Sequence, residues 1–152
     1  MFVQRQGDFG WTFHVFSQKI PSMDKKCPDL KYDYTYIEQT DSVTVLSTLT
    51  LPSALTPVET LLTAGGSTTP YRLTSVYIEP KGKKYEYRLR FVIPLSEWEQ
   101  MYKFPTPFVM DFTLKDNLSL SSFRFAYPQK KWNSNREKMN QIIYTVKLNT
   151  NK

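Results

Sequence analysis

The chain has 152 residues, with 20 Lys and Arg against 14 Asp and Glu and a pI near 9.3. This length suits one domain, and a hydrophobic fraction of 40% is enough for a packed core, which excludes an intrinsically disordered chain. The single cysteine, Cys27, excludes an internal disulfide, and one Cys with one His excludes a nitrogen–sulfur metal site. The net charge of +6 favours acidic partners or surfaces.

No apolar run approaches the roughly 20 residues that a membrane-spanning helix needs. The first ten residues include Arg5, Gln6 and Asp8 and do not resemble a signal peptide. We therefore expect a secreted, periplasmic or cell-surface protein whose leader has been removed, and a cytoplasmic protein remains the alternative.

The N-terminal part of the chain predicts a loose segment over residues 1–10 and then a strand over residues 11–19. In that strand the apolar residues Trp11, Phe13 and Val15 alternate with polar ones, so one face is buried and the other is wet. His14, the only histidine, falls on the wet face and is interpreted as a structural or solvated residue.

Residues 31–39 and 43–51 predict a hairpin around a turn at residues 40–42. The first strand places its tyrosines on one side, and the second is a β-branched run, which fits a pleated and half-buried surface. The tyrosines of the first strand are Tyr32, Tyr34 and Tyr36.

Two capping-box patterns predict short connecting helices. The first helix is expected to begin at Thr56, with Pro57 at its first position, and to end after about two turns at Gly65-Gly66. The second is expected at Ser96 and to end before Pro105.

Residues 71–94 predict the central hairpin, since the apolar residues of its second strand fall at every other position from Tyr85 to Ile93. A type I turn at residues 79–82, followed by a glycine bulge, would pair Glu79 with Lys83. This register faces Tyr77 with Tyr85, Leu73 with Leu89 and Tyr71 with Phe91. A two-residue loop at Lys81-Gly82 is the alternative, and it would bring Val76 and Ile78 inward.

The C-terminal third predicts a strand over residues 108–115, a tight turn at residues 116–117 and a return strand over residues 118–127. A change of phase in the return strand predicts a β-bulge at Ser121-Ser122. Residues 128–137 are expected to form a basic loop and residues 142–148 a last strand, with residues 149–152 loose.

These elements predict one mainly β domain, an antiparallel β-sandwich of about eight hairpin-rich strands, immunoglobulin-like or jelly-roll-like, with one or two short helices. The Tyr- and Thr-rich strands resemble, in composition, small β-sandwich modules of bacterial cell envelopes. No motif carries this resemblance, so it assigns no residues.

The absence of a catalytic motif favours a binding or structural module without a cofactor, which would recognise a protein or glycan through surface aromatics and sheet edges. The two aromatic candidates are Trp98 and Trp132, because a flat ring beside polar groups suits a sugar ring or a protein hot spot. Closure of the core by each tryptophan is the alternative.

A second hypothesis is a nucleic-acid or polyanion binder that uses two basic clusters interleaved with aromatics. The first cluster lies on the central hairpin, and the second surrounds Trp132. The clusters consist of Lys81, Lys83, Lys84, Arg88 and Arg90, and of Lys130, Lys131, Arg136 and Lys138. The alternative is that these cations protect strand edges and hairpin tips from pairing with other chains.

The third hypothesis is a small hydrolase with two carboxylates, for which Asp111, Glu86 and Asp33 are the outward-facing candidates. A metal site is not predicted, because Asp29, Asp33 and Asp41 do not have the spacing of a calcium-binding loop.

Overall fold

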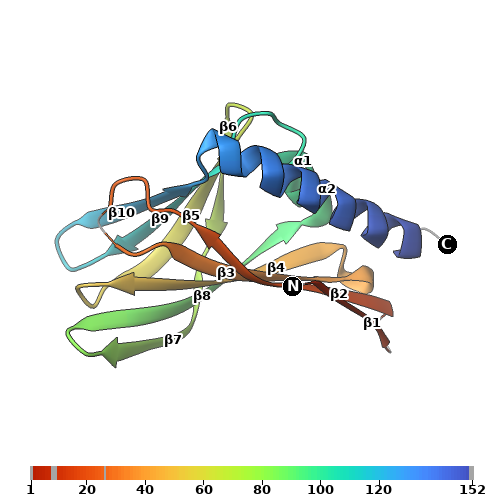
Figure 1. The fold of residues 1–152 in the computed structure, drawn as a ribbon. Helices are drawn as coiled ribbons and strands as arrows, with labels where there is room; N and C mark the ends of the chain where they lie inside the picture. Colours follow the sequence, from red (N-terminus) through yellow and green to blue (C-terminus); the bar gives the residue numbers. More distant parts are fainter. Residues whose placement is uncertain (1, 8–9, 26, 151–152) are drawn as a thin grey trace.

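The computed structural model describes residues 2–7, 10–25 and 27–150, with the side chains of 11–15, 18–25 and 27–148. The protein is a mainly β, sandwich-like domain of two antiparallel sheets with two helices (Figure 1). In spatial order, the six-stranded sheet contains β1 (Phe2–Gly7), β2 (Gly10–Ile20), β3 (Leu30–Ile37), β4 (Ser42–Leu51), β8 (Lys84–Pro94) and β7 (Thr74–Lys81). The four-stranded sheet contains β10 (Leu120–Ala126), β9 (Val109–Lys115), β5 (Thr56–Ala64) and β6 (Ser67–Arg72).

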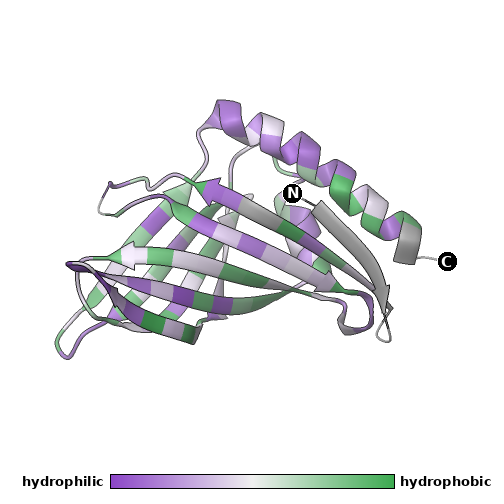
Figure 2. Cartoon of the chain, turned by 60° about the horizontal axis from the view of Figure 1, so that its bottom comes forward, coloured by the Kyte–Doolittle hydropathy of each residue, from purple (hydrophilic) through white to green (hydrophobic). Residues whose placement is uncertain are grey.

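The six-stranded sheet confirms the alternation read from the sequence. Figure 2 shows hydrophobic and hydrophilic residues alternating along the central strands of this sheet. On β3 the three tyrosines are buried, and on β8 the inward face runs from Tyr85 to Ile93. The β3–β4 hairpin is also confirmed, with a short 3-10 turn (Glu38–Thr40) between the strands. Strand alternation therefore placed the largest part of the core correctly, while the immunoglobulin-like or jelly-roll topology stays a prediction.

The prediction of a first helix after Thr56 is wrong, because residues 56–64 form the strand β5. β5 pairs with β6 on one side and with β9 on the other, and it buries Thr60 and Leu62 two positions apart. Gly65 and Gly66 have φ of 57° and 83° and form the two-residue loop of a hairpin, as glycine pairs do in type I′ turns. Pairing on both edges outweighs the local capping pattern.

The first strand of the central hairpin begins at Thr74 rather than at Tyr71. Residues 71 and 72 belong to the end of β6, and Leu73 separates β6 from β7. Both expected registers are wrong: Lys81 pairs with Lys84 and Glu79 with Glu86, with a bulge between Ser75 and Tyr77. Gly82, with φ of 63°, takes the first position of the two-residue loop, where type II′ turns require glycine. β7 is an edge strand with little cover, so apolar pairing does not decide its register, and Val76 stays exposed.

The β9–β10 hairpin is confirmed, but the predicted bulge at Ser121-Ser122 is wrong because the pairing from Leu120 to Ala126 is regular. Leu118 and Leu120 are exposed, so the apparent change of phase came from two leucines that do not enter the core.

The C-terminal prediction is wrong in both parts, because residues 129–150 form one helix, α2 (Gln129–Thr150). Its buried residues Trp132, Met139 and Val146 recur every seven positions, which puts them on one helical face. This face packs on the inner side of β2, β3 and β4 and on α1 (Leu95–Met101), leaving a void of only about 20 Å³. In the described part of the chain there are ten strands, where about eight were expected.

The second short helix is confirmed as α1, although no side-chain cap is present at its start. Residues 2–7, at the N-terminal end, pair as β1 with β2, and α2 extends to Thr150. Residues 1, 8–9 and 151–152 lie outside the described part of the chain.

Trp98 and Trp132 are buried, with exposed fractions of 1% and 0%, so neither presents an aromatic surface to a partner. Trp132 stacks on Tyr102 at 5.5 Å between ring centroids and meets Phe108 edge-on at 5.2 Å. Its Nε1 donates to the Phe104 carbonyl at 3.2 Å, which satisfies the indole N–H. The tryptophans close the core because α1 and α2 carry them inward.

We predict that Trp132→Ala lowers the free energy of unfolding by roughly 3–5 kcal/mol, the usual cost of removing a fully buried large aromatic side chain. Trp132→Phe keeps part of the ring stack and should cost less. Lys131→Ala, at the exposed neighbouring position, is the matched control and should stay within about 0.5 kcal/mol of the wild type. Urea denaturation of the three variants measures the differences, and a near-neutral Trp132→Ala would contradict the packing.

Candidate functional site

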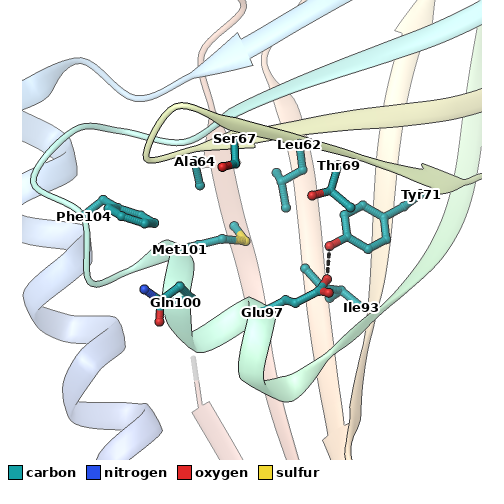
Figure 3. Close-up of a pocket in the computed structure, with 10 residues that line it drawn as sticks. All are labelled: Leu62, Ala64, Ser67, Thr69, Tyr71, Ile93, Glu97, Gln100, Met101 and Phe104. Carbon is teal, nitrogen blue, oxygen red and sulfur yellow. Dashed lines mark hydrogen bonds between the residues drawn. The ribbon is translucent and has the colours of Figure 1, made fainter.

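A cavity of about 220 Å³ lies between the β5–β6 hairpin, β8 and α1 (Figure 3). Its floor is formed by three buried apolar side chains from three elements, Leu62, Ile93 and Met101. The volume is below the roughly 300–1,000 Å³ of sites for drug-sized ligands, so the cavity fits a smaller molecule.

The β6 side of the cavity follows from strand alternation. Ser67, Thr69 and Tyr71 are two residues apart, so all three side chains stand on the face of β6 that looks toward α1 (Figure 3). Thr68 lies on the other face, where its hydroxyl bonds with that of Thr63 at 2.8 Å. The strand thus presents two hydroxyls and a phenol to the cavity.

The α1 side follows from helical spacing. Glu97, Gln100 and Met101 are three and four residues apart, which places them on one face of the helix. Trp98 on the adjacent face is buried in the core, so this anchor orients Glu97 and Gln100 toward β6. A carboxylate and an amide therefore stand opposite the hydroxyls of β6.

Tyr71 and Glu97 join the two sides of the cavity, because the Tyr71 hydroxyl donates a hydrogen bond to Glu97 Oε2. Burial raises the pKa of Tyr71 well above its ordinary value, and the bond to the Glu97 carboxylate raises it further. The phenol consequently stays protonated and keeps donating. No hydrogen bond among the described residues occupies the other oxygen of Glu97, Oε1, and this exposed side chain lines the cavity.

Phe104 closes one end of the cavity, on the loop after α1 (Figure 3). Its ring lies over Gly65, where a Cβ added to the glycine would come within 2.3 Å of two ring atoms. Glycine at position 65 therefore serves two purposes, the positive φ of the turn and the close approach of Phe104.

The first basic cluster remains on the β7–β8 hairpin, and two of its members form ion pairs. Lys81 pairs with Glu86 at 3.0 Å, and Arg88 pairs with Asp33 at 3.0 Å and bonds to Thr48. Lys83, Lys84 and Arg90 are exposed.

The second basic cluster lies on α2 rather than on a loop. Lys130, Lys131 and Lys138 are exposed, while Arg136 donates to the carbonyls of Tyr102 and Lys103 at 2.8 Å and holds the loop after α1. Figures 1 and 2 both place α2 and the β7–β8 hairpin on opposite sides of the molecule. The two clusters do not converge on one surface.

The three carboxylates considered for hydrolysis also lie apart. Asp33 is on β3, Glu86 is on β8 with β4 between them, and Asp111 is on the other sheet. Each forms an ion pair: Asp33 with Arg88, Glu86 with Lys81, and Asp111 with Arg124 at 3.0 Å. This arrangement does not supply two carboxylates to one cleft.

The sequence predicts the α1 and β8 sides of the cavity but not the β5–β6 side, so it does not bring the cavity residues together. Tyr71 was assigned to the core of the central hairpin, and residues 56–64 to a helix, so β6 was not recognised. The available signal was Gly65-Gly66 between two Thr-rich runs, which is typical of a hairpin.

Comparison of the chain with protein-family models, with curated proteins and with solved structures gives no match. Among residues 2–7, 10–25 and 27–150, no helix has the length and apolar character needed to cross a membrane. Within that same part of the chain, no group of three His, Cys, Asp or Glu residues could hold a metal ion.

We predict that Gly65→Ala destabilises the protein more than Gly66→Ala. Both substitutions place alanine at positive φ, at a cost of about 1–2 kcal/mol, but only position 65 meets a neighbour, Phe104. In a Phe104→Ala background the difference between the two glycine variants should disappear. Urea midpoints of the four variants measure it, and equal effects in the wild-type background would show that Phe104 does not rest on Gly65.

We also predict that Glu86 titrates below its ordinary range, because hydrogen bonds from Lys81 and then Tyr77 lower the pKa of its carboxyl. A depressed folded-state pKa stabilises the protein above the unfolded value, near 4.5, and this contribution is lost as the pH falls through the folded-state pKa. Lys81→Ala should raise the pKa of Glu86 in a carboxyl NMR titration, whereas Lys83→Ala should leave it unchanged. An unchanged pKa of Glu86 in the Lys81→Ala variant would contradict this pairing.

Proposed function

We propose that the protein is a non-catalytic binding module that holds one sugar ring of a glycan in the cavity between β6 and α1. The observation that carries the proposal is the composition of this cavity, an apolar floor under a rim of hydroxyls, a carboxylate and an amide. A sugar ring presents apolar C–H groups on its faces and hydroxyls around its edge, so the two surfaces complement each other.

The size and the closed end of the cavity support a single ring. A volume of about 220 Å³ leaves no room for a longer ligand inside, and Phe104 blocks one end. A glycan would enter by a terminal unit and leave the rest of its chain in solvent. The rings of Tyr71 and Phe104 border the cavity at opposite ends, where they can contact the C–H groups of a sugar (Figure 3).

The other hypotheses gain less support from the geometry. The cavity has one carboxylate among its lining residues, whereas glycoside hydrolysis in its usual form uses two. The two basic clusters lie on opposite sides, which gives a single-stranded nucleic acid no continuous groove. Trp98 and Trp132 take no part in the proposed binding, because both are buried.

The test is an NMR titration of the labelled protein with a panel of monosaccharides. We expect shifts of residues around the cavity and dissociation constants of about 1 mM, near 4 kcal/mol, as suits a small contact area. Thr69→Trp should fill the cavity and abolish binding. Thr68→Trp places the same side chain on the opposite face of β6 and should leave binding intact.

If no monosaccharide shifts the cavity residues, or if the two tryptophan variants behave alike, the proposed site is wrong. If an anionic sugar shifts only the NMR signals of the basic residues on the β7–β8 hairpin, the binding is electrostatic attraction outside the cavity.

A further inference from the structure

We infer that the cavity selects an amino sugar, a terminal unit with a protonated amine, over neutral and acidic sugars. This inference rests on the proposed sugar-binding function and adds the class of ligand. It depends on the single charged group in the cavity lining, the carboxylate of Glu97.

The part of the cavity lining that the structure describes carries one negative charge and no positive charge. Its other members are polar but neutral, Ser67, Thr69, Tyr71 and Gln100, or apolar. Among the described residues, the ion pairs formed by glutamates join Glu86 to Lys81 and Glu99 to Lys147, and none includes Glu97. The carboxylate therefore faces the cavity with a negative charge that no neighbouring cation of the described chain neutralises at close range.

Two neighbours restrain the carboxylate, which is otherwise exposed to solvent. Tyr71 donates to Oε2, and the buried neighbour Trp98 anchors the turn of α1 that carries Glu97. One oxygen thus accepts from a donor that stays protonated, and the exposed side chain leaves Oε1 accessible to a ligand in the cavity. A fixed acceptor loses less side-chain entropy on binding than a freely rotating one.

The chemistry of this acceptor favours an ammonium group. A hydroxyl and an ammonium both form charge-assisted hydrogen bonds to a carboxylate, but only the ammonium adds the attraction between opposite charges. A hydroxyl at the same ring position would form the weaker bond, an acetylated amine would lose the positive charge, and a carboxylate on the sugar would be repelled. The hydroxyl of Ser67 and the amide of Gln100 remain for the neutral hydroxyls of the ring, while the hydroxyl of Thr69 also bonds to Tyr71.

The experiment compares the affinities of glucose, glucosamine, N-acetylglucosamine and glucuronate for the full chain by NMR titration, at a pH where the amine of glucosamine is protonated. For the wild type we expect glucosamine to bind about tenfold more tightly than glucose and N-acetylglucosamine, and glucuronate to bind most weakly.

The variant Glu97→Gln removes the charge, while its amide oxygen still accepts the Tyr71 hydrogen bond. It should bind glucose somewhat more weakly than the wild type, because a neutral amide replaces a charged acceptor, lose the preference for glucosamine, and bind glucuronate better than the wild type does. Glu79→Gln, an exposed glutamate on the edge strand β7, is the matched control and should leave all four affinities unchanged.

The outcomes distinguish failure of the amino-sugar preference from failure of sugar binding. Equal binding of glucose and glucosamine by the wild type, or a preference that survives in Glu97→Gln, would overturn the amino-sugar inference and leave sugar binding intact. Absence of binding by all four sugars would overturn the proposed function and the inference together. A Glu79→Gln variant that loses the preference as fully as Glu97→Gln would show a general charge effect and would also overturn the inference.

Discussion

The inner face of the six-stranded sheet is apolar over a larger area than the four-stranded sheet covers. Phe13, Val15, Tyr34, Tyr36 and Val43 lie beyond it, on β2, β3 and β4, and they meet the helices instead. Burial of apolar surface contributes about 25 cal/mol per Å², so leaving this region open to water would cost a large part of the stability of a small domain. The long helix α2 covers it, and α1 completes the cover from the side of β8.

This cover also positions the candidate site. α1 is held against α2 by the ion pair between Glu99 and Lys147 at 2.9 Å, and Arg136 fixes the loop after α1. With Trp98 turned inward, the face of α1 that carries Glu97, Gln100 and Met101 lies toward β6 across an unfilled space. The polar rim of the cavity thus consists of residues that the helix and the strand cannot bury, placed by the residues that they do bury.

The predictions from sequence succeeded where the pattern had a period of two and the strand lay within a sheet, as on β3, β8 and β9. They failed where a local signal competed with pairing at long range. The capping box at Thr56 is a true helix-start pattern, yet β5 gains two neighbouring strands by staying extended. Ile142, Ile143 and Val146 favour a strand by propensity, yet with Trp132 and Met139 they form one face of a helix. The same errors hid the cavity, since β6 was absent from the expected elements.

The sequence by itself determined the mainly β class, the single domain and the buried faces of β3, β8 and β9, because period-two alternation is a local property of the chain. Only the tertiary structure decided which strands share a sheet, the helical state of residues 129–150, the burial of Trp98 and Trp132, and the meeting of Tyr71 with Glu97. These features depend on contacts between residues far apart in the chain, whose gain in buried area outweighs local propensity. The candidate site belongs to this second group apart from its helix α1, which the capping pattern at Ser96 predicted.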